Sequence, residues 1–240
     1  MAFGDLIPET DVSPAAWVVA GVRPFGAGVG SLVPDGFEAC ARVLHPAELD
    51  GADVRWAAVA AANGRIAHAG MEWVAITGSW DYLGRDTQPG LWDVAPADGY
   101  LPARAARSLA AVLGRFTPVQ RYWFGVWEGY GVLPAGWERR YPRIAMPQRA
   151  MYLLAGSRAD AGRPIPSFTW EQSATLWWPD DHSWCVATDL DLMSTYVGGS
   201  RACVDAIVSS AELEAFEVSP DQSLSWDSDA VNPILARPRF

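Results

Sequence analysis

The sequence predicts an α+β fold, with a mainly antiparallel sheet in the second half and several helices packed against it. Strand-like alternation is concentrated between residues 119 and 197, whereas helix-like patterns are commoner before it. Helices and strands do not alternate regularly, so a doubly wound parallel sheet is not expected. The chain has 240 residues, of which 50% are hydrophobic and 19% charged. We expect a single domain over residues 1–240, with a weak division near residues 100–117.

The first half is expected to hold one strand, two helices and a long loop. Residues 15–22 contain a Val-Val pair followed by turn-forming residues, which favours a strand. Residues 37–44 are expected to form a helix, because Phe37, Ala41 and Leu44 fall on one helical face. A second helix is expected over residues 53–62, whereas residues 71–77 are ambiguous. The many turn formers of residues 78–101 predict a loop, and loops of this length are usually functional or mobile.

The second half is expected to be mostly sheet. A helix over residues 102–114 precedes it, with Pro102 in the first turn and Gly114 at the end. Strands are expected over residues 119–130, 149–155, 173–178 and 184–197, and residues 179–183 are expected to form a hairpin turn. A last helix over residues 201–209 follows Ser200, a favourable N-cap.

Charge is distributed unevenly along the chain. Every basic side chain is arginine, the formal net charge is −10 and the isoelectric point is about 4.7. Residues 1–99 and 164–240 are strongly acidic, whereas residues 100–163 are basic. We therefore expect several arginines of residues 139–163 to pair with carboxylates of the two flanking segments. The acidic balance argues against nucleic acid as a partner and favours a protein with a basic surface.

The remaining composition indicates a soluble chain of the cytoplasm that needs no cofactor. Cys40, Cys185 and Cys203 have no disulfide-like or zinc-like spacing, so buried free thiols in a reducing compartment are expected. Apolar runs fall far short of the ~20 residues that span a bilayer, and no signal peptide is expected at the acidic N-terminus. The sequence does not define the oligomeric state.

The most informative segment is RYWFGVWEGYG, residues 121–131. Trp123 and Trp127 share one face of the expected strand, with glycines beside them that leave room for a ring. Glu128 lies among aromatic residues and is a candidate general acid or base. Should the protein bind a small ligand, we expect it near Trp123, Trp127 and Tyr130, bordered by residues 78–101. The competing interpretation is an aromatic core strand whose Glu128 pairs with an arginine of residues 139–149.

Asp189 and Asp191 form a D-x-D pattern within the strand expected over residues 184–197. Two carboxylates on one strand face can bind a divalent metal, so both are weak candidates for metal ligands. The simpler interpretation is the solvent face of a half-buried strand. It predicts that both aspartates are at least half exposed, and that the opposite face is buried, with Trp184, Val186, Leu190 and Leu192.

Three phrases of the sequence resemble conserved proteins of high-G+C bacteria to which no activity is attached: VGSLVPDGFEACARVLHP, WFGVWEGYG and LWWPDDHSWCVATDLDLMSTYVGGS. Part of the chain is also similar to the SUKH superfamily, through Leu32–Phe37 and the glycine–aromatic residues Phe124–Trp127. SUKH proteins are α+β proteins, and many are immunity proteins against secreted toxins. The resemblance implies protein binding and supplies no catalytic residues.

These observations lead to one expected function and two alternatives. We expect a non-enzymatic, acidic, tryptophan-rich protein-binding module of the cytoplasm, immunity-like in its role. The first alternative is an enzyme or small-molecule binder with an aromatic cleft around Trp123, Trp127 and Glu128. The second is a structural partner in a homo-oligomer.

Overall fold

The computed structural model describes residues 6–26, 28–79, 87–130, 133–165 and 172–233, and it confirms the α+β class. Nine strands form one antiparallel sheet in the order β1-β7-β5-β8-β9-β10-β2-β11, with β6 also paired to β7. A separate hairpin joins β3 (Ala47–Leu49) to β4 (Ala52–Val54). The strands of the large sheet are β1 (Ile7–Pro8), β2 (Ala39–Leu44), β5 (Tyr122–Trp127), β6 (Arg143–Met146), β7 (Arg149–Gly156), β8 (Leu176–Pro179), β9 (Trp184–Thr188), β10 (Ser194–Gly199) and β11 (Ala215–Val218).

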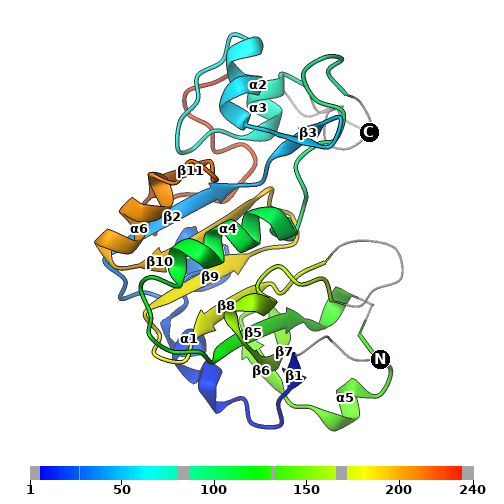
Figure 1. Ribbon diagram of the computed structural model, residues 1–240, viewed down its shortest axis with the longest axis vertical. Coiled ribbons are helices and arrows are strands. Elements are labelled where there is room, and N and C mark those ends of the chain that lie inside the picture. The colour runs from blue at the N-terminus through cyan, green and yellow to red at the C-terminus, as the bar shows by residue number, and fades with distance from the viewer. Residues whose placement is uncertain (1–5, 27, 80–86, 131–132, 166–171, 234–240) are drawn as a thin grey trace.

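Helices cover both faces of the sheet and one end of it (Figure 1). Two helices, α4 (Ala103–Leu113) and α6 (Arg201–Val208), lie side by side on the face turned toward the viewer. On the opposite face lies α1 (Ala16–Gly21), and α5 (Trp137–Arg140) follows β5. Beyond the end of β2, α2 (Trp56–Ala62) and α3 (Trp73–Thr77) pack together beside the β3–β4 hairpin.

Three apolar clusters follow from this arrangement. Alternating residues of β9 enter the two main cores, because successive side chains of a strand point to opposite faces. Trp184 packs in the cluster under α4 and α6, whereas Cys185 packs in the cluster that contains Val18 of α1. The third cluster joins Trp56 and Trp73 at the end of the sheet.

Most expected elements of the second half are confirmed. The structure has α4, β5, β7, β8 and α6 within two to three residues of the expected bounds. The turn after β8 joins two antiparallel strands, with His182 N–H donating to the Pro179 carbonyl. Ser200 is the N-cap of α6, since its hydroxyl accepts a 3.2 Å hydrogen bond from the Cys203 amide.

Two expectations for the first half were wrong. Residues 39–44 form strand β2, not a helix, and all six are buried between β10 and β11. A strand covered on both faces has apolar residues throughout, so it also satisfies a helical spacing by chance. Residues 16–21 form helix α1, not a strand, because the preceding Ser13-Pro14 turn starts helical geometry and Val18 packs into the core.

The strand expected over residues 184–197 is instead two strands, β9 and β10, joined by a turn at residues 189–193. Trp184 and Val186 are buried as expected, but Leu190 and Leu192 are only half-buried. The period-2 pattern ends at Thr188, and the two aspartates mark the turn rather than a strand face. Of the loop expected over residues 78–101, residues 80–86 lie outside the described residues; residues 87–101 contain two isolated bridges and no longer element.

The basic middle segment does contact both acidic flanks. Among arginines 139–163, however, the described cross-segment ion pair is that of Arg149, which reaches Asp189 at 2.8 Å. Arg143 and Arg163 pair inside the middle segment, with Glu128 and Asp160. Other arginines of residues 100–163 reach the N-terminal flank: Arg104 pairs with Asp53 and Arg121 with Glu9.

Candidate functional site

The structure places Trp123 in the core of β5. Its side chain is 5% exposed, and its indole N–H donates a 2.8 Å hydrogen bond to Asp180. The Arg121 guanidinium lies 4.2 Å from the centre of its ring, a cation–π distance. Both the indole N–H and the ring face of Trp123 are therefore occupied by other residues of the protein.

Trp127, Glu128 and Tyr130 lie where β5 ends in a short 3₁₀ turn. The Trp127 and Tyr130 rings pack edge to face at 5.4 Å. The Tyr130 hydroxyl is 2.9 Å from Thr175 Oγ1, and burial raises its pKa to about 12. Glu128 pairs with Arg143 near the surface. In the described part of residues 78–101, the Gly99 carbonyl accepts a 3.3 Å hydrogen bond from the Tyr130 hydroxyl, so the expected proximity of the two segments is present there.

The two aspartates of the D-x-D pattern lie in different surroundings. Asp189 is paired with the mostly buried Arg149, and its side chain is only 19% exposed, contrary to the expected half exposure. Asp191 is exposed and lies at the mouth of a cleft. In the described residues, no group of three or more His, Cys, Asp or Glu side chains could hold a metal ion.

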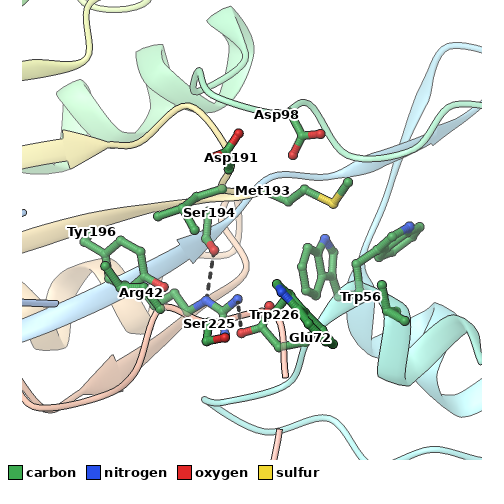
Figure 2. A pocket seen from close by; sticks show the side chains of 14 residues that line it. Arg42, Trp56, Glu72, Asp98, Asp191, Met193, Ser194, Tyr196, Ser225 and Trp226 are labelled. Carbon is green, nitrogen blue, oxygen red and sulfur yellow. Dashed lines mark hydrogen bonds and ion pairs between the residues drawn. The ribbon is translucent and has the colours of Figure 1, made fainter. Parts of the chain in front are cut away.

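That cleft, of about 440 Å³, lies where β2 and β10 meet α2, α3 and the C-terminal segment, residues 219–233 (Figure 2). It is the candidate functional site. Its floor is formed by Arg42 and Tyr196, and its aromatic side by Trp56 and Trp73. The residues Trp123, Trp127 and Glu128 do not line it.

Arg42 is a buried cation whose hydrogen bonds are made inside the protein. Its side chain is 2% exposed and pairs with Glu72 at 3.1 Å. Its guanidinium also donates to Ser194 Oγ at 2.9 Å and to the carbonyls of Ala69 and Met71. Burial raises the pKa of Glu72 to about 7, and the neighbouring Arg42 only partly offsets this.

The aromatic side of the cleft is rigid. The Trp56 indole N–H donates to the His45 carbonyl at 2.7 Å, and its ring lies 5.2 Å from that of Trp73. The first amides of α2, those of Trp56 and Ala57, donate to the Glu214 carboxylate. This carboxylate satisfies amides that a helix N-terminus leaves without partners, and so fixes α2 against the chain near β11.

Asp98 and Asp191 form an acidic mouth on the cleft. Figure 2 shows both on one side of the cleft, with Glu72 and Trp226 on the other. Both aspartates are exposed, and among the described residues neither side chain has an ion pair or hydrogen bond. Partial burial, and next the charge of Asp191, raise the pKa of Asp98 to about 6.

A buried histidine, His45, links the two chain segments that carry Asp98 and Asp191. His45 Nδ1 is 2.6 Å from the Ala97 carbonyl, and Nε2 is 2.9 Å from Thr195 Oγ1. Burial lowers the pKa of His45 to about 4, so the ring is neutral, with Nδ1–H donating to Ala97 and Nε2 accepting from Thr195. The Gly99 amide also donates to the Leu192 carbonyl. Asp98 and Asp191 are thereby held next to each other.

The C-terminal segment closes the remaining side with Leu224, Ser225 and Trp226. It is fastened beyond the cleft by Asp229, whose side chain is fully buried and accepts from His68 Nε2 at 3.0 Å. Burial acts to raise the pKa of Asp229, but hydrogen bonds from Asn232 and other groups outweigh it and lower the pKa. Trp226 is held at the rim with 41% of its surface exposed.

Sequence reasoning missed most of this cleft. Arg42 was assigned to a helix, although a single cation inside the apolar run Ala39–Leu44 is a signal for a buried ion pair. Asp98 and Asp191 are 93 positions apart, and contacts between distant segments, those of His45 and the Gly99–Leu192 hydrogen bond, place them together. Comparison with protein-family models, curated proteins and solved structures finds no match to this chain.

Two further findings concern membrane-spanning helices and the cysteine thiols. None of the helices in the described part of the chain is both long and apolar enough to cross a membrane. All three cysteines are buried and free, as expected, and burial raises the pKa of each thiol. Thiolate chemistry is therefore disfavoured at all three positions.

Proposed function

We propose that the protein is a non-enzymatic acidic binding module whose cleft receives a basic side chain of a partner protein. The observation that carries the proposal is the acidic mouth: in the described residues neither Asp98 nor Asp191 has a cationic partner, and the arginine of the same cavity, Arg42, is paired with Glu72. Many other carboxylates of this chain have an arginine partner. A cation that entered the mouth would relieve the repulsion between the two aspartates.

The shape and overall charge of the molecule agree with such a ligand. Tryptophan faces attract cations, and Trp226 at the rim is 41% exposed, whereas Trp56 and Trp73 are buried in the wall behind it. The net charge of −10 would attract a basic partner from a distance and speed its encounter. An immunity-like role in the cytoplasm, which the SUKH resemblance implies, would be one form of this function.

Binding of short peptides to the intact protein tests the proposal. Three blocked pentapeptides that differ only at the central residue, arginine, lysine or the neutral citrulline, are titrated while tryptophan fluorescence and NMR shifts are followed. We expect the two cationic peptides to bind and citrulline to bind at least tenfold more weakly. Affinity should fall between 0.05 and 0.5 M salt, because solvent-exposed charges are screened.

A pair of matched variants locates the binding. Replacing both mouth carboxylates in the double variant D98N with D191N should weaken binding of the cationic peptides at least tenfold. The control D50N with E138Q removes the same charge from exposed positions outside the cleft and should leave binding unchanged. Equal binding of arginine and citrulline peptides, or no effect of the mouth variant, would contradict the proposal.

The enzyme or small-molecule alternative is favoured by a different observation, the raised pKa of Glu72 inside the cleft. A carboxyl group with a pKa near 7 can act as a general acid or base at neutral pH. A thermal-shift screen of neutral organic compounds tests this function. A ligand whose stabilisation is lost in E72Q but kept in D98N with D191N would favour it over the binding module.

A further inference from the structure

A second surface of the molecule carries unbalanced charge, on the face of the sheet away from α1. There, α4 and α6 lie side by side (Figure 1), and a shallow groove of about 760 Å³ runs between them. Arg107 of α4 and Arg115, just after α4, line it on one side. Glu212, just after α6, lines it on the other side.

The charged side chains of this groove have no ionic partners within the described chain. Arg107 has neither an ion pair nor a hydrogen bond there. The Arg115 guanidinium donates only to the Val112 carbonyl, at 3.3 Å, and lies 5.7 Å from the Phe116 ring. Glu212, just after α6, and Asp205 of α6, which is exposed outside the groove lining, likewise make no ion pair in the described chain. Arg201 does act on Asp205 through its charge, without an ion pair. The α4 side of the groove thus presents positive charge and the α6 side negative charge.

Between the charges the surface is small and apolar. Ala111 and Val112 of α4 face Ala206 of α6 across the groove. Small side chains permit another helix to approach closely. Burying this strip would provide the free energy of association, while the charges would choose the partner and its orientation.

We propose that the α4–α6 face is the contact between two copies of this chain in a two-fold symmetric dimer. In such a contact the same patch is used twice, so a patch that is positive on one side and negative on the other complements itself. Arg107 and Arg115 of each copy would meet Asp205 and Glu212 of its partner. This proposal is independent of the cleft and of the function proposed for it.

Exposed ion pairs contribute only ~0–1 kcal/mol each. The wild-type charges therefore determine how the two copies are oriented more than how tightly they associate. Reversal of a whole set has a larger effect, because it places like charges opposite each other at both ends of a two-fold contact. The dimer can therefore be tested by charge exchange. Arg107, Arg115, Asp205 and Glu212 are all exposed, so their substitution should leave the fold intact.

The first measurement is the mass of the full-length protein in solution, by light scattering and sedimentation over 1–100 µM. We expect the wild-type protein to be a dimer in the upper part of this range. The variant R107E with R115E should be a monomer throughout. The control R139E with R140E changes the net charge equally on α5 and should remain a dimer. A wild-type monomer at every concentration would overturn the proposal.

The second measurement mixes two variants. R107E with R115E and D205R with E212R should each be monomeric alone, since each opposes like charges. A one-to-one mixture should form a heterodimer, because both halves of the two-fold contact then pair opposite charges. Dimerisation of either variant alone, or a mixture that stays monomeric while the wild-type protein dimerises, would overturn this face as the contact. Circular dichroism checks that each variant is folded.

Discussion

Arg42 shows how one buried residue organises the end of the sheet. It lies on β2, yet its guanidinium reaches Ser194 on β10 and Glu72 just before α3. It also binds carbonyls of the chain before α3. A buried charge is tolerated only when its hydrogen bonds are made, and here they are made to two parts of the chain far apart in sequence, residues 69–72 and Ser194.

We predict that R42M destabilises the protein by about 3–5 kcal/mol, because the buried Glu72 loses its partner and must either stay charged without it or take up a proton. The double variant R42M with E72M should recover most of that loss, since removing both charges removes the desolvation penalty as well. Urea unfolding of the three proteins at pH 7.5 measures both values. A double variant no more stable than R42M would show that the hydrogen bonds of Arg42, rather than its charge pair, hold this region.

His45 predicts an acid-dependent loss of stability. Its pKa is about 4 in the folded protein and about 6.5 when unfolded, so the unfolded chain binds more protons between these values. Stability contributed by neutral His45 is complete above pH 6.5 and is lost as pH falls toward 4, by up to about 3 kcal/mol. Glu72 acts in the opposite sense, because its raised pKa favours folding when it is protonated, below pH 7.

Comparison with H45Q separates the two groups, since Glu72 is present in both proteins. Urea unfolding at pH 7, 5.5 and 4 should show the wild-type protein losing stability relative to H45Q as pH falls. Parallel pH profiles for the two proteins would contradict the assignment.

At the scale of elements, local signals predicted structure well where local contacts determine it. Ser200 was recognised as an N-cap and does cap α6. The alternation of residues 119–130 predicted β5, and Pro102 with Gly114 predicted α4. Prediction from the sequence was wrong at β2 and at the turn after Thr188, where pairing between strands determines the conformation. A six-residue apolar run carries no local sign of which neighbours will cover it.

The cap of α6 gives a prediction at this scale. We expect S200A to destabilise the protein by ~1 kcal/mol, because the Cys203 amide loses its acceptor. S200G should lose only a few tenths of a kcal/mol, since glycine is itself favourable at an N-cap. Thermal and urea unfolding distinguish the two; equal losses would show that the hydroxyl has another role.

At the scale of the whole molecule, β2 joins the two halves of the chain. It is paired with β10 on one side and β11 on the other, so residues 39–44 are enclosed by residues 194–218. The weak division expected near residues 100–117 would separate these strands. The cleft depends on the same pairing, which explains why its residues could not be grouped from sequence.

We therefore predict one cooperative unfolding transition. Tryptophan fluorescence, which reports all three clusters, and far-UV circular dichroism should give the same urea midpoint. A fragment of residues 1–99 should not fold alone, because β2 would lack both neighbours. Two separated transitions, or a folded fragment with native-like amide protection, would show that the chain contains two domains.

The position of β2 also has a consequence for how the chain is made. Residues 39–44 leave the ribosome long before residues 194–218 are synthesised, so β2 remains unpaired through most of synthesis. During that time its unpaired backbone and apolar side chains are open to other nascent chains. Contacts that span so much sequence form slowly, and the intermediates before them are prone to aggregate. Chaperone supply and growth temperature should consequently affect the yield of this protein more than its final stability suggests.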